Sequence, residues 1–252
     1  MNTDRTTMKA DPGQQWKLLD LASLDTRTAQ IAHRRANLPE AEAAAAALRT
    51  LEDLEAELVR ARTDLSDTER EATKAAADVQ IVIDRIKRTT ARLDDGSASA
   101  RELQNLQSEL ESLERRRSVL ESERTVVDKR ARVLRERVTD LEPREAEASA
   151  ALTQARAAEK KARNDLDDAE HTISRSRQDF AEGVQSDLLS LYEKIRTSTG
   201  MGAAALTQRR CGGCNLELLG RDLQRVATAP LNEVVRCENC SRIIVRTSDS
   251  GL

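Results

Sequence analysis

Apolar side chains recur every seven residues through two long stretches of the chain. In the first stretch, one series begins at Leu51 and a second begins three residues later, at Leu54. Alternating steps of three and four residues keep both series on one side of a helix, so they correspond to the a and d positions of a coiled coil. The a series consists of Leu51, Leu58, Leu65, Ala72, Val79, Ile86 and Leu93.

The second stretch has its d series from Leu106 to Leu141 and its a series from Leu103 to Val138. Between the two stretches lies Asp94-Asp95-Gly96-Ser97, where Gly96 can take the left-handed conformation that ends a helix. Ser99 and Glu102 have the spacing of a capping box that starts the next helix. A short turn makes its two helices antiparallel neighbours, so we expect a hairpin in which residue i lies opposite about residue 193 − i.

This hairpin is expected to occupy residues 12–197, with its turn near 94–99 and a break at Pro39. Residues 143–197 should then continue one long helix and pair with residues 14–50. Arg117 and Arg124 fall at a positions, where they should snorkel or pair with acids of the facing helix. Residues 1–11 are polar and are expected to form a disordered tail. A coiled coil between two chains is the alternative, but the matched lengths of the two arms favour a hairpin.

The composition agrees with a thin apolar stripe and disagrees with a thick globular core. Charged residues make up 34% of the 252 residues, and there is one Trp, one Tyr and one Phe. No apolar run approaches the ~20 residues that span a bilayer, and the first residues lack the apolar segment of a signal peptide. We therefore expect a cytoplasmic protein without membrane contact. No nucleophile–base set or phosphate loop is recognisable, which argues against an enzyme with a small-molecule substrate.

All four cysteines lie in two C-x-x-C pairs near the C-terminus, and they are the predicted metal ligands Cys211, Cys214, Cys237 and Cys240. A C-x-x-C turn directs two thiolates to the same side, so two such pairs supply the four corners of a tetrahedron. Zn²⁺ suits four thiolates, and a site with four protein ligands has no open position for catalysis. The sequence therefore predicts one structural zinc ion.

Three other interpretations of the cysteines are weaker. A redox C-x-x-C needs only one pair, within a strand-then-helix fold. Two disulfides need an oxidising compartment, for which nothing in the sequence argues. A single iron ion in the same four-thiolate ligand set stays open.

The cysteines lie in a small domain at 203–247 that follows a Thr-, Ser- and Gly-rich linker. Leu219, Leu223 and Val226 mark one face of a short helix, and residues 232–236 and 242–246 are expected to form two strands. The fold class is therefore mainly α: a long antiparallel coiled-coil hairpin with a small C-terminal zinc ribbon of mixed α and β structure. The ribbon has few apolar residues, so zinc should supply much of its stability.

The chain resembles the bacterial C4-type zinc-ribbon proteins that carry an N-terminal coiled-coil hairpin. The resemblance covers about residues 14–247 and is most specific in the runs at 101–107, 191–192, 211–214 and 233–243. It implies that the four cysteines bind zinc and that the protein has no catalytic activity. Some members of the family are connected with RNA, an alternative sigma factor or export machinery. Ser241 departs from the pattern, because glycine usually follows the last cysteine and eases a tight turn.

Positive charge is concentrated on the ribbon. Residues 207–247 have seven arginines and four acids, a net charge of +3, whereas the rest of the chain has a net charge of −6. This asymmetry favours contact between the ribbon and the phosphates of RNA or DNA. The alternative is that these arginines solvate a small domain or balance the negative Zn(Cys)₄ centre. The four arginines that flank the cysteine pairs are the predicted phosphate contacts: Arg209, Arg210, Arg242 and Arg246.

The sequence thus favours a non-enzymatic adaptor whose coiled coil binds an unknown protein partner and whose ribbon binds a nucleic acid. The alternative is a scaffold whose ribbon recognises a protein. Trp16, Phe180 and Tyr192 are the only aromatic residues, and the hairpin pairing brings them to the end nearer the ribbon. We expect them to form an apolar base for the hairpin. A hydrophobic docking patch for a partner is the other interpretation.

Overall fold

The computed structural model describes residues 8–252, which form five helices and four strands. The helices are α1 (Pro12–Ala36), α2 (Pro39–Asp94), α3 (Ala100–Glu182), α4 (Ser186–Thr199) and α5 (Gly220–Thr228). The strands are β1 (Ala203–Thr207), β2 (Arg210–Cys211), β3 (Val235–Arg236) and β4 (Ile243–Val245). By its contacts the chain divides into a unit of Glu40–Ala157 and a unit made of the residues up to Pro39 with Ala158–Leu252. None of the helices within residues 8–252 combines the length and apolar character needed to cross a membrane.

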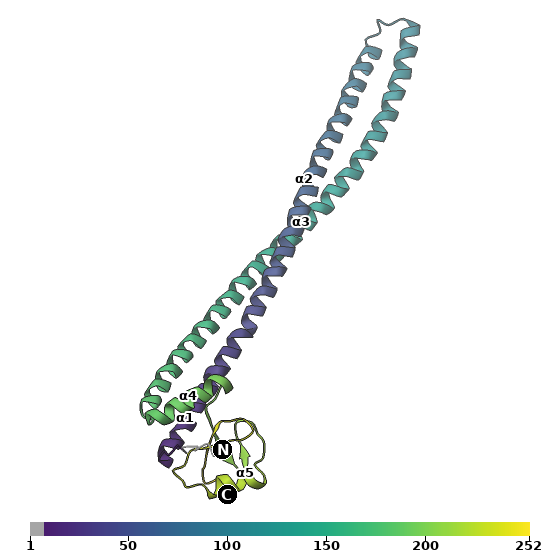
Figure 1. The fold of residues 1–252 in the computed structure, drawn as a ribbon. Coiled ribbons are helices and arrows are strands. Elements are labelled where there is room, and N and C mark those ends of the chain that lie inside the picture. Colours follow the sequence, from purple (N-terminus) through teal and green to yellow (C-terminus); the bar gives the residue numbers. More distant parts are fainter. Residues whose placement is uncertain (1–7) are drawn as a thin grey trace. The chain divides into compact units, whose positions relative to one another are not determined.

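The unit Glu40–Ala157 is an antiparallel helical hairpin made from most of α2 and the first part of α3 (Figure 1). Gly96 has a φ of 67°, the left-handed conformation expected at the end of the first arm. The Ser99 backbone N–H donates to the Glu102 carboxylate at 2.8 Å, and the Glu102 N–H donates to the Ser99 hydroxyl oxygen at 3.4 Å. The predicted turn, capping box and hairpin fold are therefore confirmed.

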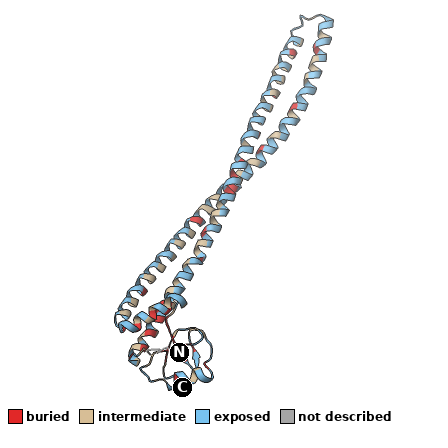
Figure 2. Cartoon of the chain, viewed as in Figure 1, coloured by how far each residue is buried: buried red, intermediate tan, exposed pale blue. Residues whose placement is uncertain are grey.

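The heptad positions deduced from the sequence account for both the buried side chains and the ion pairs of this hairpin. Buried residues recur along the facing sides of α2 and α3 (Figure 2), and Leu54, Leu58, Ala61 and Leu141 form one cluster. Five ion pairs between the two arms each join two e positions or two g positions, as expected for antiparallel helices. The e pairs are Arg62–Glu142 and Arg135–Glu69, and the g pairs are Arg85–Glu109, Arg130–Glu71 and Arg137–Glu57.

The buried seam residues are offset from the sequence-based pairing rule, although two ion pairs nearly obey it. Arg85–Glu109 near the turn and Arg137–Glu57 far from it are both one residue from the expected pairing. The same rule places Leu58 opposite residue 135, but Leu58 shares its cluster with Leu141, six residues further along α3. Because the offset of these ion pairs is the same at both places, the two arms advance equally, and burial of Leu141, which is 1% exposed, fixes which seam residues meet.

The two a-position arginines are exposed, as expected for snorkelling, and do not pair with the facing helix. Arg117 pairs with Glu121 at 2.8 Å and Arg124 with Asp128 at 3.3 Å, both one turn further along the same helix. These side chains therefore extend along their own helix. The a position of the coiled-coil seam is therefore polar over two consecutive heptads.

In the other unit, the long second helix ends earlier than the sequence suggested. α3 stops at Glu182, and α4 begins at Ser186 after a break that contains Gly183. Side chains of α1 satisfy the backbone there: the Lys17 ammonium donates to the Gly183 carbonyl at 2.7 Å, and the Gln14 side-chain oxygen accepts from the Gln185 N–H at 2.9 Å. The break lets α4 bury Leu188, Tyr192 and Ile195 against α1. The expectation of one continuous helix over 100–197 was wrong.

The same unit contains a mixed four-stranded sheet in the order β2-β1-β4-β3. β1 and β4 are parallel, and the two outer pairs are antiparallel. Successive side chains of a strand point to opposite faces. Accordingly, Ala203, Ile243 and Val245 join the core of α1 and α4, whereas Ala204, Leu206 and Ile244 join a second core with α5 and the cysteines. The strand β1 was not expected from the sequence, which placed these residues in the ribbon domain without assigning them to a strand.

Residues 8–10 and 248–250 pack against the ribbon, which was not expected from the sequence. The tail predicted for residues 1–11 falls partly outside the described residues, but Met8–Ala10 are ordered. Ala10 is buried and its N–H donates to the Asn232 carbonyl at 2.8 Å, while Lys9 forms a β-bridge with Glu233. At the other end, the Ser250 hydroxyl donates to the Leu206 carbonyl at 3.0 Å. The ribbon therefore extends beyond residue 247 and uses backbone groups at both ends of the chain.

A buried carboxylate joins the helices of this unit. Asp25 of α1 is 5% exposed, and it accepts hydrogen bonds from the Tyr192 hydroxyl at 2.6 Å and the Arg177 guanidinium at 2.7 Å. Burial and the neighbouring Asp25 carboxylate raise the pKa of Tyr192. Of the three aromatics expected to form an apolar base, only Tyr192 is buried; Trp16 is 55% exposed and Phe180 is 43% exposed.

Gly202, which precedes β1, packs directly against Tyr192 of α4. This close contact gives a testable prediction. A Cβ on this residue would lie 2.5 Å from both Tyr192 Cδ2 and the Tyr192 carbonyl oxygen. Gly202→Ala should therefore lower the free energy of unfolding of this unit by about 2 kcal/mol. The measurement is urea unfolding followed by fluorescence of Trp16, the only tryptophan. Gly183→Ala is the matched control, since its Cβ would meet only atoms at 3.4 Å and beyond. Equal stability of the two variants would contradict the packing.

Candidate metal centre

Two chain segments with the same backbone pattern hold the cysteines. In the first, the Asn215 N–H donates to the Cys211 carbonyl at 2.8 Å, and the Cys211 N–H donates to the Leu216 carbonyl at 3.0 Å. In the second, the Ser241 N–H donates to the Cys237 carbonyl at 2.8 Å, and the Cys237 N–H donates to the Arg242 carbonyl at 2.9 Å. We call these two turns the first and second knuckle, residues 211–216 and 237–242. Each knuckle directs its two sulfur atoms to the same point.

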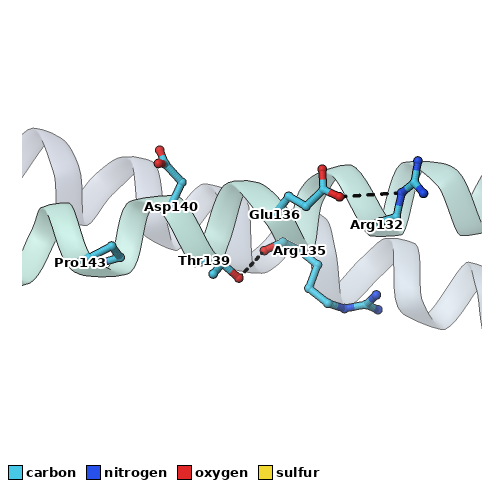
Figure 3. A pocket seen from close by; sticks show the side chains of 6 residues that line it. All are labelled: Arg132, Arg135, Glu136, Thr139, Asp140 and Pro143. Carbon is cyan, nitrogen blue, oxygen red and sulfur yellow. Dashed lines mark hydrogen bonds and ion pairs between the residues drawn. The ribbon is translucent and has the colours of Figure 1, made fainter.

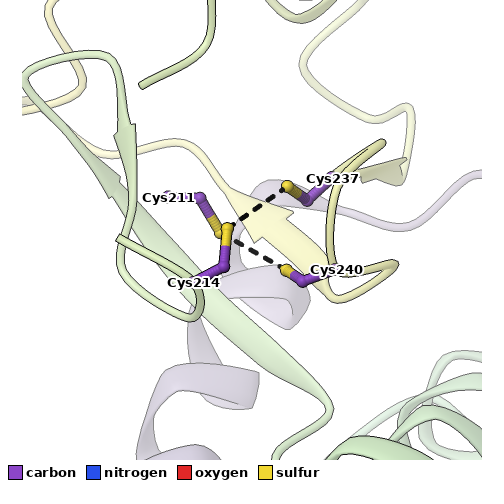
Figure 4. Close-up of side chains that lie close together, drawn as sticks. All are labelled: Cys211, Cys214, Cys237 and Cys240. Atoms are coloured by element: carbon purple, nitrogen blue, oxygen red, sulfur yellow. Dashed lines mark hydrogen bonds between the residues drawn. The ribbon is translucent and has the colours of Figure 1, made fainter. Parts of the chain in front are cut away.

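The four sulfur atoms have the spacing that a zinc ion requires (Figure 4). All four lie within 4.8 Å of one another, with Cys211 Sγ 3.8 Å from Cys240 Sγ and Cys214 Sγ 3.9 Å from Cys237 Sγ. A tetrahedron with Zn–S bonds of about 2.3 Å has edges of about 3.8 Å. The donor set and its spacing therefore fit one tetrahedral Zn²⁺ with no further ligand, as predicted from the sequence.

Burial makes the thiols poor acids in the absence of a metal. It raises the pKa of Cys211, and it raises the pKa of Cys237 to about 12. Burial also opposes ionisation of Cys240, but hydrogen bonds from the backbone and side chain of Arg242 outweigh it, so the pKa of this thiol is lowered. A bound cation must displace the remaining protons, so zinc binding and folding of the knuckles are coupled to proton release.

Arg242 ties the two knuckles to the end of α4. Its guanidinium donates to the carbonyls of Thr199 at 2.6 Å, Met201 at 3.2 Å and Gly213 at 3.1 Å. Gly213 must lack a side chain for this contact, because its Cβ would lie 2.6 Å from Arg242 Cδ. The arginine beside the four thiolates therefore offsets their negative charge and fixes the first knuckle at the same time.

The residue after each cysteine pair has a left-handed backbone. Asn215 has a φ of 60° and Ser241 has a φ of 62°. Asparagine tolerates this region better than most residues, whereas serine is strained there. The strain expected at Ser241 from the missing glycine is thus present in the structure.

The four arginines predicted to contact phosphates do not share one open surface. Arg242 is engaged as described, and the half-buried Arg246 donates to five carbonyls at the end of α5 and in the loop after it. These carbonyls belong to Val226, Ala229, Pro230, Leu231 and Glu233, at 2.5–3.3 Å. Arg209 and Arg210 are exposed beside the β1–β2 turn. Arg209 Nε donates to the Gly251 carbonyl at 3.0 Å, and Arg210 lies 3.6 Å from Glu217. Three of the four guanidinium groups therefore donate to backbone carbonyls, two of them from half-buried positions.

Sequence reasoning passed over a different group of arginines. Arg221 and Arg225 are exposed one turn apart on α5, and the Arg225 guanidinium donates to the Arg236 carbonyl at 3.0 Å. Arg236 is exposed as well. We call Arg221, Arg225 and Arg236 the α5 basic cluster. The helical spacing of the first two was a usable signal, but the proximity of Arg236 depends on the tertiary fold.

Trp16 adds an aromatic surface that the ribbon sequence itself lacks. Its indole N–H donates to the Arg246 carbonyl at 2.9 Å, and more than half of the residue is exposed. Leu231, 70% exposed, is close by, since its carbonyl accepts from both Gln15 and Arg246. This unit thus has an exposed aromatic side chain at Trp16 and an exposed leucine in a segment linked to the same part of α1.

The surface hollows of the described residues show no catalytic arrangement. One lies along α3 beside Pro143 (Figure 3), where Arg132 pairs with Glu136 at 3.8 Å and the Thr139 hydroxyl donates to the Arg135 carbonyl at 2.9 Å. Pro143 has no N–H for the Thr139 carbonyl, yet α3 continues through it. A second hollow lies beside Asp25, whose charge is balanced by Arg177 and Arg196. Glu170, His171 and Ser174 also line this second hollow, but among the described residues no hydrogen bond joins a nucleophile to a base there.

A helical coiled-coil hairpin with a four-cysteine zinc ribbon is the class of protein that this fold and site define. Residues 21–200 match the model of the CT398-like coiled coil hairpin domain, and residues 210–244 match that of the C4-type zinc ribbon domain. The chain belongs to the family of CT398-like coiled-coil hairpin proteins with a C4-type zinc ribbon, and its four cysteines bind one structural zinc ion. This combination is an interaction scaffold, and nothing in it indicates catalysis.

Relatives extend over nearly the whole chain. An uncharacterised protein of Mycobacterium tuberculosis is 32% identical over 239 residues, which cover 95% of this chain and 98% of the relative. A solved Mycobacterium smegmatis structure is 31% identical, with a TM-score of 0.80 over 95% of this chain and 100% of the other. The structure of CT398 from Chlamydia trachomatis is 16% identical, with a TM-score of 0.63 over 93% and 98% of the two chains, and shares the fold.

Removal of one ligand should abolish zinc binding. The purified protein should contain about one equivalent of zinc, and Cys237→Ser should contain almost none, because three thiolates no longer complete the tetrahedron. Metal analysis measures this directly. Fluorescence of Trp16 should change in the same variant, because its indole N–H donates a hydrogen bond to the Arg246 carbonyl. Residue 246 directly follows β4, which packs against the knuckles. A full equivalent of zinc in Cys237→Ser would contradict the four-thiolate assignment.

Ser241→Gly should strengthen zinc binding. Glycine removes the left-handed strain but adds freedom to the unfolded chain, so the net gain should be about 0.5 to 1 kcal/mol, or roughly two- to fivefold in apparent affinity. Competition with a chelator measures the affinity. Ser248→Gly is the control: Ser248 is exposed and has no positive φ, so this change should give no gain. Equal zinc affinities for the wild type and both variants would show that the left-handed conformation of Ser241 does not weaken zinc binding.

Proposed function

We propose that the zinc ribbon binds the phosphate backbone of RNA or DNA through its exposed arginines, while the hairpin binds a protein partner. The observation that carries this proposal is the number of arginines left exposed on the ribbon after Arg242 and Arg246 are assigned to the fold. Five arginines of this small domain remain exposed: Arg209, Arg210, Arg221, Arg225 and Arg236.

The distribution of charge favours binding of a nucleic acid to the ribbon and not to the rest of the chain. Glu217 and Glu238 lie near Arg210 and Arg225, at 3.6 and 2.8 Å, and partly offset them. Arg221 has no side-chain partner among the described residues. The rest of the chain has a net charge of −6 and should repel a polyanion. Contacts with phosphates are largely independent of sequence, so base selectivity should be slight.

The alternative is that the ribbon unit recognises a protein, and Trp16 is the observation in its favour. The indole is held in place by its hydrogen bond and is more than half exposed, and aromatic anchors of this kind dominate many protein interfaces. The alternative predicts that Trp16→Ala abolishes binding of the partner while charge reversal on the α5 basic cluster has little effect.

Charge reversal at exposed arginines should weaken nucleic-acid binding. Arg210→Glu/Arg221→Glu should lower the affinity for RNA and duplex DNA and reduce the dependence of binding on salt. Each phosphate contact contributes about 0.7 to 0.9 to the slope of log affinity against log salt, so three or four contacts give a slope near −3. A salt titration of the wild type and the variant measures both quantities.

The control for this experiment is Arg88→Glu/Arg175→Glu, which reverses two exposed arginines on α2 and α3. It changes the net charge by the same amount but leaves the ribbon intact, so its binding should match the wild type. No binding at low salt, or equal loss in both variants, would reject a nucleic-acid site on the ribbon.

A further inference from the structure

The hairpin unit has a line of exposed apolar side chains on its outer surface. Val119, Val126 and Val133 of α3 are 49%, 66% and 59% exposed, and Ile81 of α2 is 63% exposed. Single exposed apolar residues are normal. Three valines seven residues apart are different, because this spacing places them along one side of a helix that follows the coiled coil.

All four side chains lie on the same side of the hairpin. The valines and Ile81 occupy c positions, which are next to the g positions around a helix. The ion pairs Arg85–Glu109 and Arg130–Glu71 show that g positions of the two arms meet on one side. Ile81 lies between Arg85 and Glu71 on α2, so it is level with the part of α3 between Glu109 and Arg130, which contains Val119 and Val126. We call this side the g face.

The apolar side of α3 is turned toward the g face in this region. Arg117 and Arg124 occupy the a positions and pair with acids of their own helix. The apolar residues of α3 from 119 to 134 therefore fall mainly at the c and d positions, with Leu120 buried and Val119 exposed. An ordinary two-helix seam would need apolar residues at a, not at c.

We propose that the g face binds the g face of a second copy of this chain, forming a four-helix bundle with both hairpin turns at the same end. A two-fold axis parallel to the helices then places α3 of one copy over α2 of the other. Val119 meets Ile81 of the second copy at about the same level, so the apolar side chains cover one another.

The charges beside the apolar line favour this arrangement. The g positions of α2 in this region are acidic: Glu57, Asp64, Glu71 and Asp78. Three of the four g positions at 116–137 of α3 are basic, namely Arg116, Arg130 and Arg137, and the fourth is Glu123. Asp64, Asp78 and Arg116 have no side-chain partner among the described residues. The other face-to-face arrangement, with α2 on α2, would place acids against acids.

Sedimentation equilibrium of the full, zinc-loaded chain tests the proposal. The wild type should show a monomer–dimer equilibrium in the micromolar range, because the contact is small. Val119→Glu/Val126→Glu/Val133→Glu should weaken self-association by about 100-fold or more, since it places charges in the interface. Val59→Glu is the matched control: Val59 is 62% exposed at a b position on the opposite side of α2, and its replacement should leave the dimer unchanged.

A charge exchange tests the arrangement. Arg116→Glu should weaken the dimer, and Asp78→Arg in the same chain should restore it. Helical circular dichroism and zinc content should be unchanged in every variant, because all of these side chains lie outside the intramolecular seam. A wild type that is monomeric at all concentrations would overturn the proposal and leave the g face to a different protein. So would a dimer that is weakened by Val59→Glu but not by the triple variant.

Discussion

Strand β4 consists of three consecutive residues with no exposed surface, Ile243, Ile244 and Val245. Neighbouring residues of a strand point to opposite faces, so this strand is stable only where both faces of the sheet are covered. Helices α1 and α4 cover one face, and α5 with the two knuckles covers the other. Zinc and the helices therefore stabilise the same strand from opposite sides. The ribbon is not an independent domain on a linker, even though it is a separate segment of the sequence.

This two-sided burial explains why so much of the ribbon's positive charge is used internally. Small strands and short turns leave many carbonyl groups without partners in a sheet or helix. Arg246 satisfies the carbonyls at the end of α5, and Arg242 joins the first knuckle to the end of α4. A guanidinium with five N–H donors is suited to this task. Net charge calculated from the sequence thus overstates the charge that a partner meets, and the exposed arginines are the relevant set.

The sequence predicted those features that depend on residues close together in the chain. The heptads, the capping box at Ser99, the four thiolates and the strained Ser241 are each determined within a few residues. It missed features that depend on distant partners. Ala203–Thr207 forms a strand because β4 lies beside it, and α3 ends near Gly183 because Lys17 and Gln14 satisfy the break. The carbonyls that engage Arg246 are 13 to 20 residues away, so local charge counting could not identify them.

The hairpin is specified more by charge than by the size of its apolar residues. Ala61 and Thr68 at d positions are buried but contribute little apolar area, and Arg117 and Arg124 interrupt the a series. The g face has basic α3 residues opposite acidic α2 residues, in Arg130–Glu71 and Arg137–Glu57. Exposed pairs contribute only about 0.2 to 1 kcal/mol each. Their pattern nevertheless disfavours pairing of α2 with α2 or α3 with α3, since like charges would meet. Charge therefore selects the partner arm, and the few large apolar residues, Leu58 and Leu141 among them, set the register.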